Sequence, residues 1–184
     1  VRDMTVAGEE EDDHPGDADD VAANAIGPAL APAAPPIRVF AHPVHHESEQ
    51  LAMVMLQEAV DDWCHVTISD TRKLPSRAIA EIVETRPSVV VLTVVPPGGI
   101  PQAKFLCREI RTACPELCII VAYMAKPKNY DHLLVQFRDS GCSYLTTSIS
   151  QTVSHIEQVA ESVKAEADER QANGNGIIDR AASR

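Results

Sequence analysis

Hydrophobic and polar positions alternate along residues 37–171 in a pattern that predicts five strands, each followed by a helix. Short β-branched runs that end at turn residues are typical of strands, and longer segments with apolar residues three and four apart are typical of helices. The run SVVVLTVV at 88–95 indicates a strand that is covered on both faces. Strands are expected at 37–43, 64–70, 88–95, 117–124 and 142–147, and helices at 48–63, 75–86, 100–113, 130–140 and 149–171.

This alternation predicts an α/β fold in three layers, with a doubly wound, flavodoxin-like parallel sheet of five strands in the order 2-1-3-4-5. Ligands of such folds bind beyond the carboxyl ends of the strands where the order reverses, here strands 1 and 3. The loops at this switch point are AHPVHHES at 41–48 and VVPPGG at 94–99.

The two ends of the chain differ from the middle in composition. Residues 1–36 hold nine Asp or Glu against one Arg, and so carry −8 of the net charge of −11. Their acidic and Ala/Pro-rich composition predicts a disordered leader, and the Gly/Asn-rich residues 172–184 predict a flexible tail around a domain at 37–171. Because the chain begins with Val1, a true start and a fragment boundary both remain open.

Charge and cysteine content exclude some classes of function. The remaining charge of −3 over residues 37–184 offers no basic face for nucleic acid. Five cysteines without a CxxC motif favour a reducing cytosol, and Cys107 and Cys114 fall on an apolar helix stripe that predicts core packing. No apolar run approaches the roughly 18 residues of a membrane span.

The switch-point loops hold the candidate ligand-binding residues. These are His42, His45, Thr93, Gly98 and Gly99, joined by Thr147 after the last strand. His42, His45 and His46 are close enough in sequence to suggest a metal site, but adjacent His45 and His46 point different ways and no second ligand cluster is apparent. A solvated loop, with Glu47, Ser48 and Glu49 placed to cap the helix that follows, is the favoured interpretation. We therefore predict no metal and no cofactor.

Motifs for catalysis are not found in the sequence. It has no GxSxG nucleophile elbow and no glycine-rich phosphate loop, so no catalytic residue and no enzyme activity are predicted. The backbone N–H groups of Gly98 and Gly99, ahead of a helix, could receive an anion. The nearest basic residues are expected to be Arg38, Lys126 and Lys128.

The segments LTVVPPGGIPQAKFLCREIR at 92–111 and FRDSGCSYLTTSI at 137–149 resemble response-regulator receiver domains. The functional residues of that family are replaced, with Thr93 in place of the phospho-accepting Asp, Thr147 in place of the Lys, and Ala41-His42 in place of the acidic metal-binding pair. The resemblance implies a degenerate receiver that acts by protein contacts without phosphorylation. A homodimer would form through residues 130–140 and Tyr144.

The stretch PVHHES at 43–48 resembles in part the Asp-x-His-x-x-Gly motif of cobalamin-binding domains. His45 matches the histidine that binds cobalt in that family. Pro43 replaces the Asp and Ser48 the Gly, so the known binding mode is in doubt. A sensor that binds cobalamin or a metal through His45 remains an alternative.

A third resemblance covers nearly the whole predicted domain. The stretch at 89–124 resembles the soluble domain that follows the membrane part of some autoinducer-2 exporter (AI-2E) family permeases, and HPVHHESEQLAMVMLQEAV at 42–60 is similar to the first loop and helix of that domain. The shared pattern is Pro-Pro-Gly, then Ala-Lys-Phe-Leu-Cys-Arg-Glu-Ile-Arg, then Pro-Glu-Leu, here at 96–98, 103–111 and 115–117. The 184 residues contain no permease segment, so an upstream permease and a module used alone both remain open.

These resemblances imply a non-catalytic cytoplasmic regulatory or interaction module, associated with a membrane transporter at the inner face of the membrane or with another protein partner. A small-molecule ligand could bind in the switch-point cleft. The ligand, the transported substrate and the oligomeric state are left open by the sequence.

Overall fold

The computed structural model describes residues 37–60 and 63–181, with side chains up to residue 166. The leader predicted at 1–36 lies outside the described residues. The strands are β1 (Ile37–Pro43), β2 (Cys64–Ile68), β3 (Val89–Val94), β4 (Cys118–Tyr123) and β5 (Tyr144–Thr146). The helices are α1 (Glu47–Val60), α2 (Pro75–Thr85), α3 (Ile100–Ala113), α4 (Tyr130–Arg138) and α5 (Ile149–Ala181).

All five strands are parallel and lie in the order β2-β1-β3-β4-β5, which confirms the predicted fold class. The register places Pro43 beside Thr93, Thr93 beside Ala122, and Ala122 beside Thr146. These four residues form one row at the carboxyl ends of the strands. The order reverses between β1 and β3, so the loops that follow these two strands meet at the switch point.

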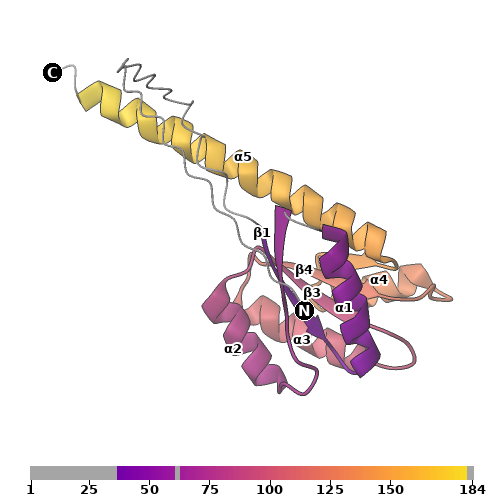
Figure 1. Cartoon of the computed structure of the whole chain (residues 1–184). Coiled ribbons are helices and arrows are strands. Elements are labelled where there is room, and N and C mark those ends of the chain that lie inside the picture. Colours follow the sequence, from indigo (N-terminus) through magenta and orange to yellow (C-terminus); the bar gives the residue numbers. More distant parts are fainter. Residues whose placement is uncertain (1–36, 61–62, 182–184) are drawn as a thin grey trace, which may run out of the picture. The chain divides into compact units, whose positions relative to one another are not determined.

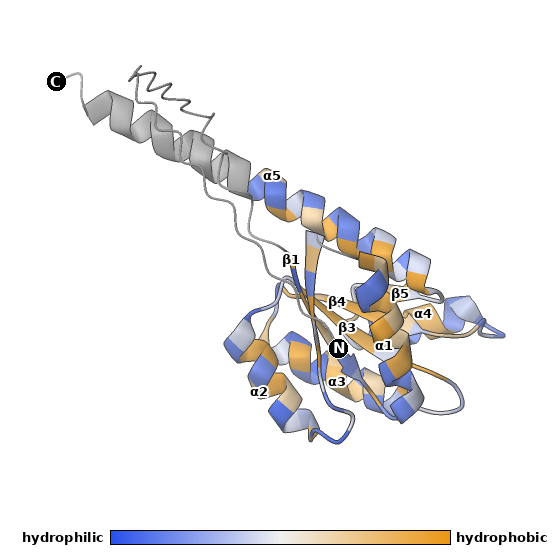
Figure 2. Ribbon diagram, in the orientation of Figure 1, coloured by the Kyte–Doolittle hydropathy of each residue, from blue (hydrophilic) through white to orange (hydrophobic). Residues whose placement is uncertain are grey.

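Two apolar cores lie on opposite faces of the sheet, as Figure 1 shows for the helices that cover them. Met53, Leu56, Ile156 and Ala160 of α1 and α5 pack against one face. Helices α2, α3 and α4 cover the other with residues such as Ile82, Leu106 and Phe137. Figure 2 shows that apolar residues concentrate in the central strands, and every residue of β3 is buried, as expected for a strand covered on both faces.

The ends of several elements differ from the sequence expectations. β5 begins at Tyr144 rather than at 142, because the Cys142 N–H donates to Phe137 O at 3.1 Å and closes α4 instead. Gly141 ends α4 with a positive φ of 88°, as predicted, and glycine is the residue that most often adopts this conformation after a helix. Helix α5 does not end at 171 but continues to Ala181, since its backbone stays helical through part of the segment that we expected to be a flexible tail.

Candidate functional site

A buried carboxylate joins the two switch-point loops. Glu49, in the first turn of α1, is fully buried. Its Oε2 accepts hydrogen bonds from the N–H groups of His45 at 2.7 Å and His46 at 3.1 Å. Its Oε1 accepts from the N–H of Val95, the first residue after β3, at 3.1 Å. The capping predicted for Glu49 is therefore confirmed, and the same side chain also fixes the loop after β3 against the loop after β1.

The turn at Pro96–Gly99 depends on glycine for its shape. The Pro96–Pro97 bond is cis, and Gly98 and Gly99 have φ of 104° and 78°, which L side chains rarely adopt. A Cβ on Gly99 would lie 2.9 Å from Val94 Cγ1 and 3.6 Å from Glu49 Oε1. The absence of a side chain at Gly99 thus lets α3 begin directly against the Glu49 carboxylate.

His45 is exposed and its ring lies over Gly98. A Cβ on Gly98 would come within 3.2 Å of His45 Cε1. The neighbouring His46 instead caps α1, because its Nδ1 accepts from the Ser48 N–H at 3.1 Å. Within the described residues, no group of three or more His, Cys, Asp or Glu side chains is placed to hold a metal ion.

Thr93 and Thr147 are placed differently. The Thr93 carbonyl oxygen accepts a hydrogen bond from the N–H of Val44, in the loop after β1, at 3.3 Å. Thr93 is buried and shares the α1–α5 face of the sheet with Val91, because side chains alternate along a strand. Thr147 lies in the loop before α5, where its hydroxyl donates to Gln151 Oε1 at 3.1 Å and its N–H donates to the same oxygen at 2.9 Å. The structure therefore groups His45, Gly98 and Gly99, but gives Thr147 a local role at the start of α5.

His42 lies on the other face of the sheet. It shares with Phe40 the side that α2 and α3 cover, is only 3% exposed, and has no hydrogen-bond partner for Nδ1 among the described residues. Burial, and secondarily the nearby Lys73 ammonium, lowers the His42 pKa from 6.5 to about 4, while Glu81 acts weakly in the opposite direction. His42 is therefore a neutral imidazole near pH 7.

His42 lines a pocket of about 440 Å³ between the first turns of α2 and α3, which we call the His42 pocket. Its polar lining comes from His42, Thr71, Lys73 and Gln102. Its apolar lining comes from Val44, Pro75, Pro101, Phe105 and Leu106. The pocket volume falls within the usual range for small-molecule sites.

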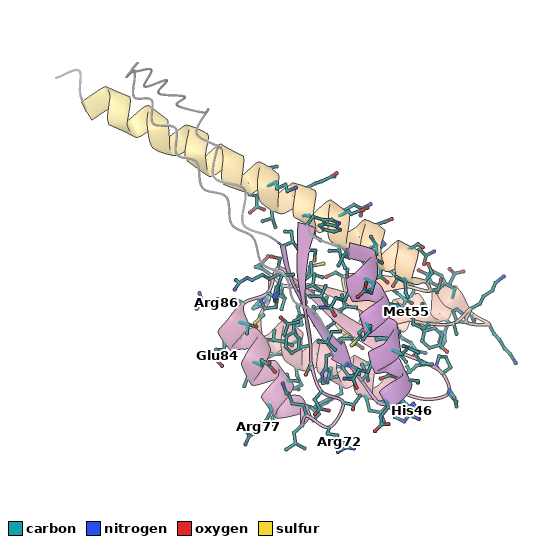
Figure 3. The ribbon with its side chains drawn as sticks, in the orientation of Figure 1. His46, Met55, Arg72, Arg77, Glu84 and Arg86 are labelled. Carbon is teal, nitrogen blue, oxygen red and sulfur yellow. The ribbon has the colours of Figure 1, made fainter. Side chains whose placement is uncertain are left out.

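The charge beside this pocket is balanced. The Lys73 ammonium donates a hydrogen bond to the Glu81 carboxylate, and both side chains are about one-third exposed. On the same end of the molecule, Arg72 and Glu47 form an exposed ion pair at 3.9 Å. Figure 3 shows His46 and Arg72 at this end and Arg86 at the other.

Arg38 does not lie at this site, so its expected role near Gly98 and Gly99 is wrong. Its guanidinium donates to Arg86 O at 3.0 Å, and the Arg38 carbonyl accepts from the Ser88 N–H at the amino end of β3. A second pocket, of about 480 Å³, lies at that opposite edge and includes Arg86 and Cys114 in its lining. Lys126 and Lys128 are exposed in the loop after β4.

The cysteines belong mainly to the cores. Cys107 is fully buried, and a hydrogen bond with Cys142, followed by burial, raises the pKa of its thiol. Burial raises the pKa of the Cys64 thiol to about 11. The predicted core packing is confirmed for Cys107, whereas Cys114 is only half-buried because it follows the last residue of α3.

Sequence reasoning missed two features of the site. It treated Glu49 as a cap within one loop, although a Glu in the first turn after a switch-point strand was a signal for a contact with the neighbouring loop. It also missed Lys73 and Glu81 beside His42. No motif joins these three residues, because they converge only when α2 packs on the sheet.

No protein-family model matches this sequence, and no curated protein sequence matches it. Solved structures do share its fold. A cobalamin-binding protein from Desulfitobacterium hafniense has a TM-score of 0.57 at 9% identity, over 68% of this chain and 60% of that one. The chain thus spans less than two thirds of that protein's length.

Two response regulators are similar over almost their whole length. A LuxR-family regulator from Aurantimonas sp. SI85-9A1 has a TM-score of 0.54 at 19% identity, over 74% of this chain and 99% of that one. A CheY-like receiver domain protein from Methanospirillum hungatei JF-1 has a TM-score of 0.53 at 11% identity, over 71% of this chain and 98% of that one. At these identities the likeness establishes a flavodoxin-like α/β fold shared with receiver and cobalamin-binding domains.

Proposed function

We propose that this domain is a non-catalytic regulatory module that receives a signal at the carboxyl edge of its sheet and passes it to a membrane transporter. The observation that supports this most strongly is the Glu49 carboxylate. It holds the loops after β1 and β3 together through three backbone N–H groups, so both loops can respond as one unit to a ligand or a partner.

The chemistry at the edge favours regulation over catalysis. Receiver domains use a carboxylate at the end of their third strand, and this chain has Thr93 there. Glu49 is the nearby carboxylate, but its two oxygens already accept hydrogen bonds from the backbone. Incubation with acetyl phosphate and Mg²⁺ should therefore leave the intact mass of the protein unchanged, and a phosphorylated species would contradict the proposal.

A transporter partner is supported by the sequence resemblance to autoinducer-2 exporter family permeases and by apolar side chains on the outer face of α1. Leu51 and Met55 are 65% and 53% exposed, and Met55 projects outward in Figure 3. Exposed apolar residues that gather on one face are typical of protein contacts. Among the helices of residues 37–60 and 63–181, none has the length and apolar character needed to cross a membrane.

The coding frame upstream of Val1 tests this partner. Several in-frame hydrophobic segments of about 20 residues would support a cytoplasmic position beside a membrane domain on the same chain. Lack of such segments, both in this frame and in the neighbouring genes, would count against it.

Cobalamin binding through His45 is the alternative, favoured by the exposed position of its ring at the carboxyl edge. The surrounding residues fit the cofactor poorly. Pro43 provides no carboxylate to orient the imidazole, and the His45 ring packs on Gly98. A change in the absorption spectrum of hydroxocobalamin with the wild-type protein, and none with His45→Ala, would support this alternative over the main proposal.

A further inference from the structure

We propose that the outer face of α1 docks a helical segment of the partner protein, apolar on one side and rich in Lys and Arg around that side. This inference rests on the proposed regulatory function, and it names the surface and the chemistry of the partner. We call this surface the α1 row. Its members are Glu47, Leu51, Val54, Met55 and Glu58.

The centre of the α1 row is apolar and exposed. Leu51, Val54 and Met55 are 65%, 42% and 53% exposed. Val54 and Met55 lie three and four positions after Leu51, so the three side chains adjoin on one side of the helix. Met53 and Leu56 already fill the core on the other side, and Met55 projects outward in Figure 3. The unbranched thioether of methionine adapts to the shape of a partner.

Carboxylates close both ends of this apolar centre. Glu47 lies four positions before Leu51, Glu58 lies three positions after Met55, and α1 contains no Lys or Arg. The ion pair between Glu47 and Arg72 is exposed and 3.9 Å long, so it contributes little and a partner's cation can replace it. Within the described residues, Glu58 forms no ion pair. The α1 row therefore complements a cationic partner.

The same charge disfavours two other occupants. Helices that lie on anionic lipid carry Lys and Arg on their polar face, whereas α1 carries carboxylates. A second copy of this chain would place α1 against α1, so Glu47 and Glu58 would meet like charges, which is unfavourable. A cationic amphipathic helix avoids both repulsions and can lay its apolar side on the centre of the row.

A membrane transporter is a suitable source of such a segment, since loops on the cytoplasmic side of membrane proteins carry an excess of Lys and Arg. The α1 row is also joined to the switch point. Glu49, in the first turn of the same helix, holds the loops after β1 and β3 through its two carboxylate oxygens. A segment docked on α1 would therefore respond to changes in both loops.

The test uses the full 184-residue chain and two synthetic peptides. Each peptide is designed as an amphipathic helix of about four turns, with leucine on one side and either lysine or glutamate on the other. Fluorescence anisotropy of the labelled peptide gives its Kd, and two-dimensional NMR of the ¹⁵N-labelled chain locates the contact. We expect the Leu/Lys peptide to bind with micromolar Kd, to shift the amide signals of α1, and to bind about tenfold more tightly than the Leu/Glu peptide.

Leu51→Gln combined with Met55→Gln removes the apolar centre but keeps good helix formers, and should weaken binding of the Leu/Lys peptide about tenfold. Val83→Gln combined with Val135→Gln is the matched control, because these side chains are 44% and 57% exposed on α2 and α4. It should bind as the wild type does. Glu58→Gln should weaken binding several-fold at low salt and much less at high salt, where charges are screened.

Three results of the peptide test overturn the inference: a Leu51→Gln/Met55→Gln variant that binds like the wild type, a Leu/Glu peptide that binds equally well, or NMR shifts that lie outside α1. Two further measurements address the other occupants. Vesicles of phosphatidylcholine and phosphatidylglycerol should not bind the chain, and sedimentation of the chain alone should show no dimer that the double variant dissociates. Vesicle binding or such a dimer would assign the α1 row to lipid or to a second copy, and so overturn the inference.

Failure of this test can be distinguished from failure of the regulatory proposal. Peptide binding is measured on the isolated chain, whereas regulation is measured as transport by the whole encoded protein. If α1 ignores the Leu/Lys peptide but the domain still changes transport, only the chemistry of the partner is wrong. If α1 binds the peptide but the domain leaves transport unchanged, the docking surface stands and the regulatory proposal fails.

Discussion

Oε1 of Glu49 accepts a hydrogen bond from the backbone N–H of Val95 at 3.1 Å, although the two residues are 46 positions apart in the sequence. Through this bond the first turn of α1 reaches the end of β3. The carboxylate is fully buried, and its remaining oxygen is used by the loop after β1. A charged side chain in such a place is tolerated because backbone N–H groups replace the water that it lost.

Glu49→Ala should lower the free energy of unfolding by about 2–4 kcal/mol, because three backbone donors would lose a charged acceptor. Urea unfolding followed by the fluorescence of Trp63, the one tryptophan of the chain, measures this loss. The control is Glu47→Ala, two positions away. Its exposed ion pair with Arg72 is expected to contribute less than about 0.5 kcal/mol. Equal effects of the two substitutions would refute the role given to Glu49.

Gly99→Ala should destabilise the domain by about 1–3 kcal/mol, through both its positive φ and its contact with Val94. Gly98→Ala should cost less, because the atom nearest its new Cβ belongs to the exposed and movable ring of His45. Thermal unfolding of both variants would rank them. If Gly99→Ala proved more stable than Gly98→Ala, the contact with Val94 would not decide which variant loses more stability.

Stability should depend on pH through His42. Its folded pKa of about 4 lies below the ordinary value of 6.5, so between these values the unfolded chain binds more protons than the folded one. The contribution of neutral His42 is therefore complete above pH 6.5 and is lost as the pH falls towards 4, by at most about 3 kcal/mol. Unfolding at a series of pH values should show this slope in the wild type and a shallower one in His42→Phe.

The Lys73→Met variant separates the causes of that shift. Its side chain keeps the apolar stem but removes the ammonium, which is the second cause of the lowered pKa after burial. The pKa of His42, read from its ring signals in an NMR titration, should rise but stay below 6.5, since burial persists. A pKa unchanged by the substitution would mean that Lys73 does not act on His42.

Arg111 should be important for stability at the opposite edge. Its guanidinium donates to Leu117 O at 2.8 Å, Gly141 O at 2.8 Å and Ser143 Oγ at 3.1 Å, and also to Pro115 O. Arg111→Lys keeps the charge but loses the fork geometry, and should cost about 1–2 kcal/mol against about 3 for Arg111→Ala. Arg108→Ala, on the exposed side of α3, is the control and should change the urea midpoint little.

The fold could be predicted from the sequence because its signals are local. The β-branched run at 88–95 and the apolar stripes of the helices are each specified within a few residues, and parallel strands with short connections allow few arrangements. Helix α5 was predicted too short, because Gly and Asn at 173–176 were interpreted as breakers.

The candidate site was predicted less completely because it depends on contacts between distant residues. The sequence placed His45, Gly98 and Gly99 on neighbouring loops, and they do meet. It could not show that His42 turns to the other face of the sheet, since that depends on the register of β1. The position of Lys73 and Glu81 beside His42 depends on how α2 packs, which no local pattern encodes.

Export by the whole encoded protein tests the regulatory proposal most directly. The complete gene, and a version that lacks the codons for residues 37–181, would be expressed in cells without their own exporter. Export of the transporter's substrate, with autoinducer-2 as the first compound tried, would be measured per transporter molecule in the membrane. We predict that the deletion changes the export rate several-fold at equal transporter abundance. An equal export rate for both proteins, or the lack of a membrane part both in this gene and in its neighbours, would contradict the proposal.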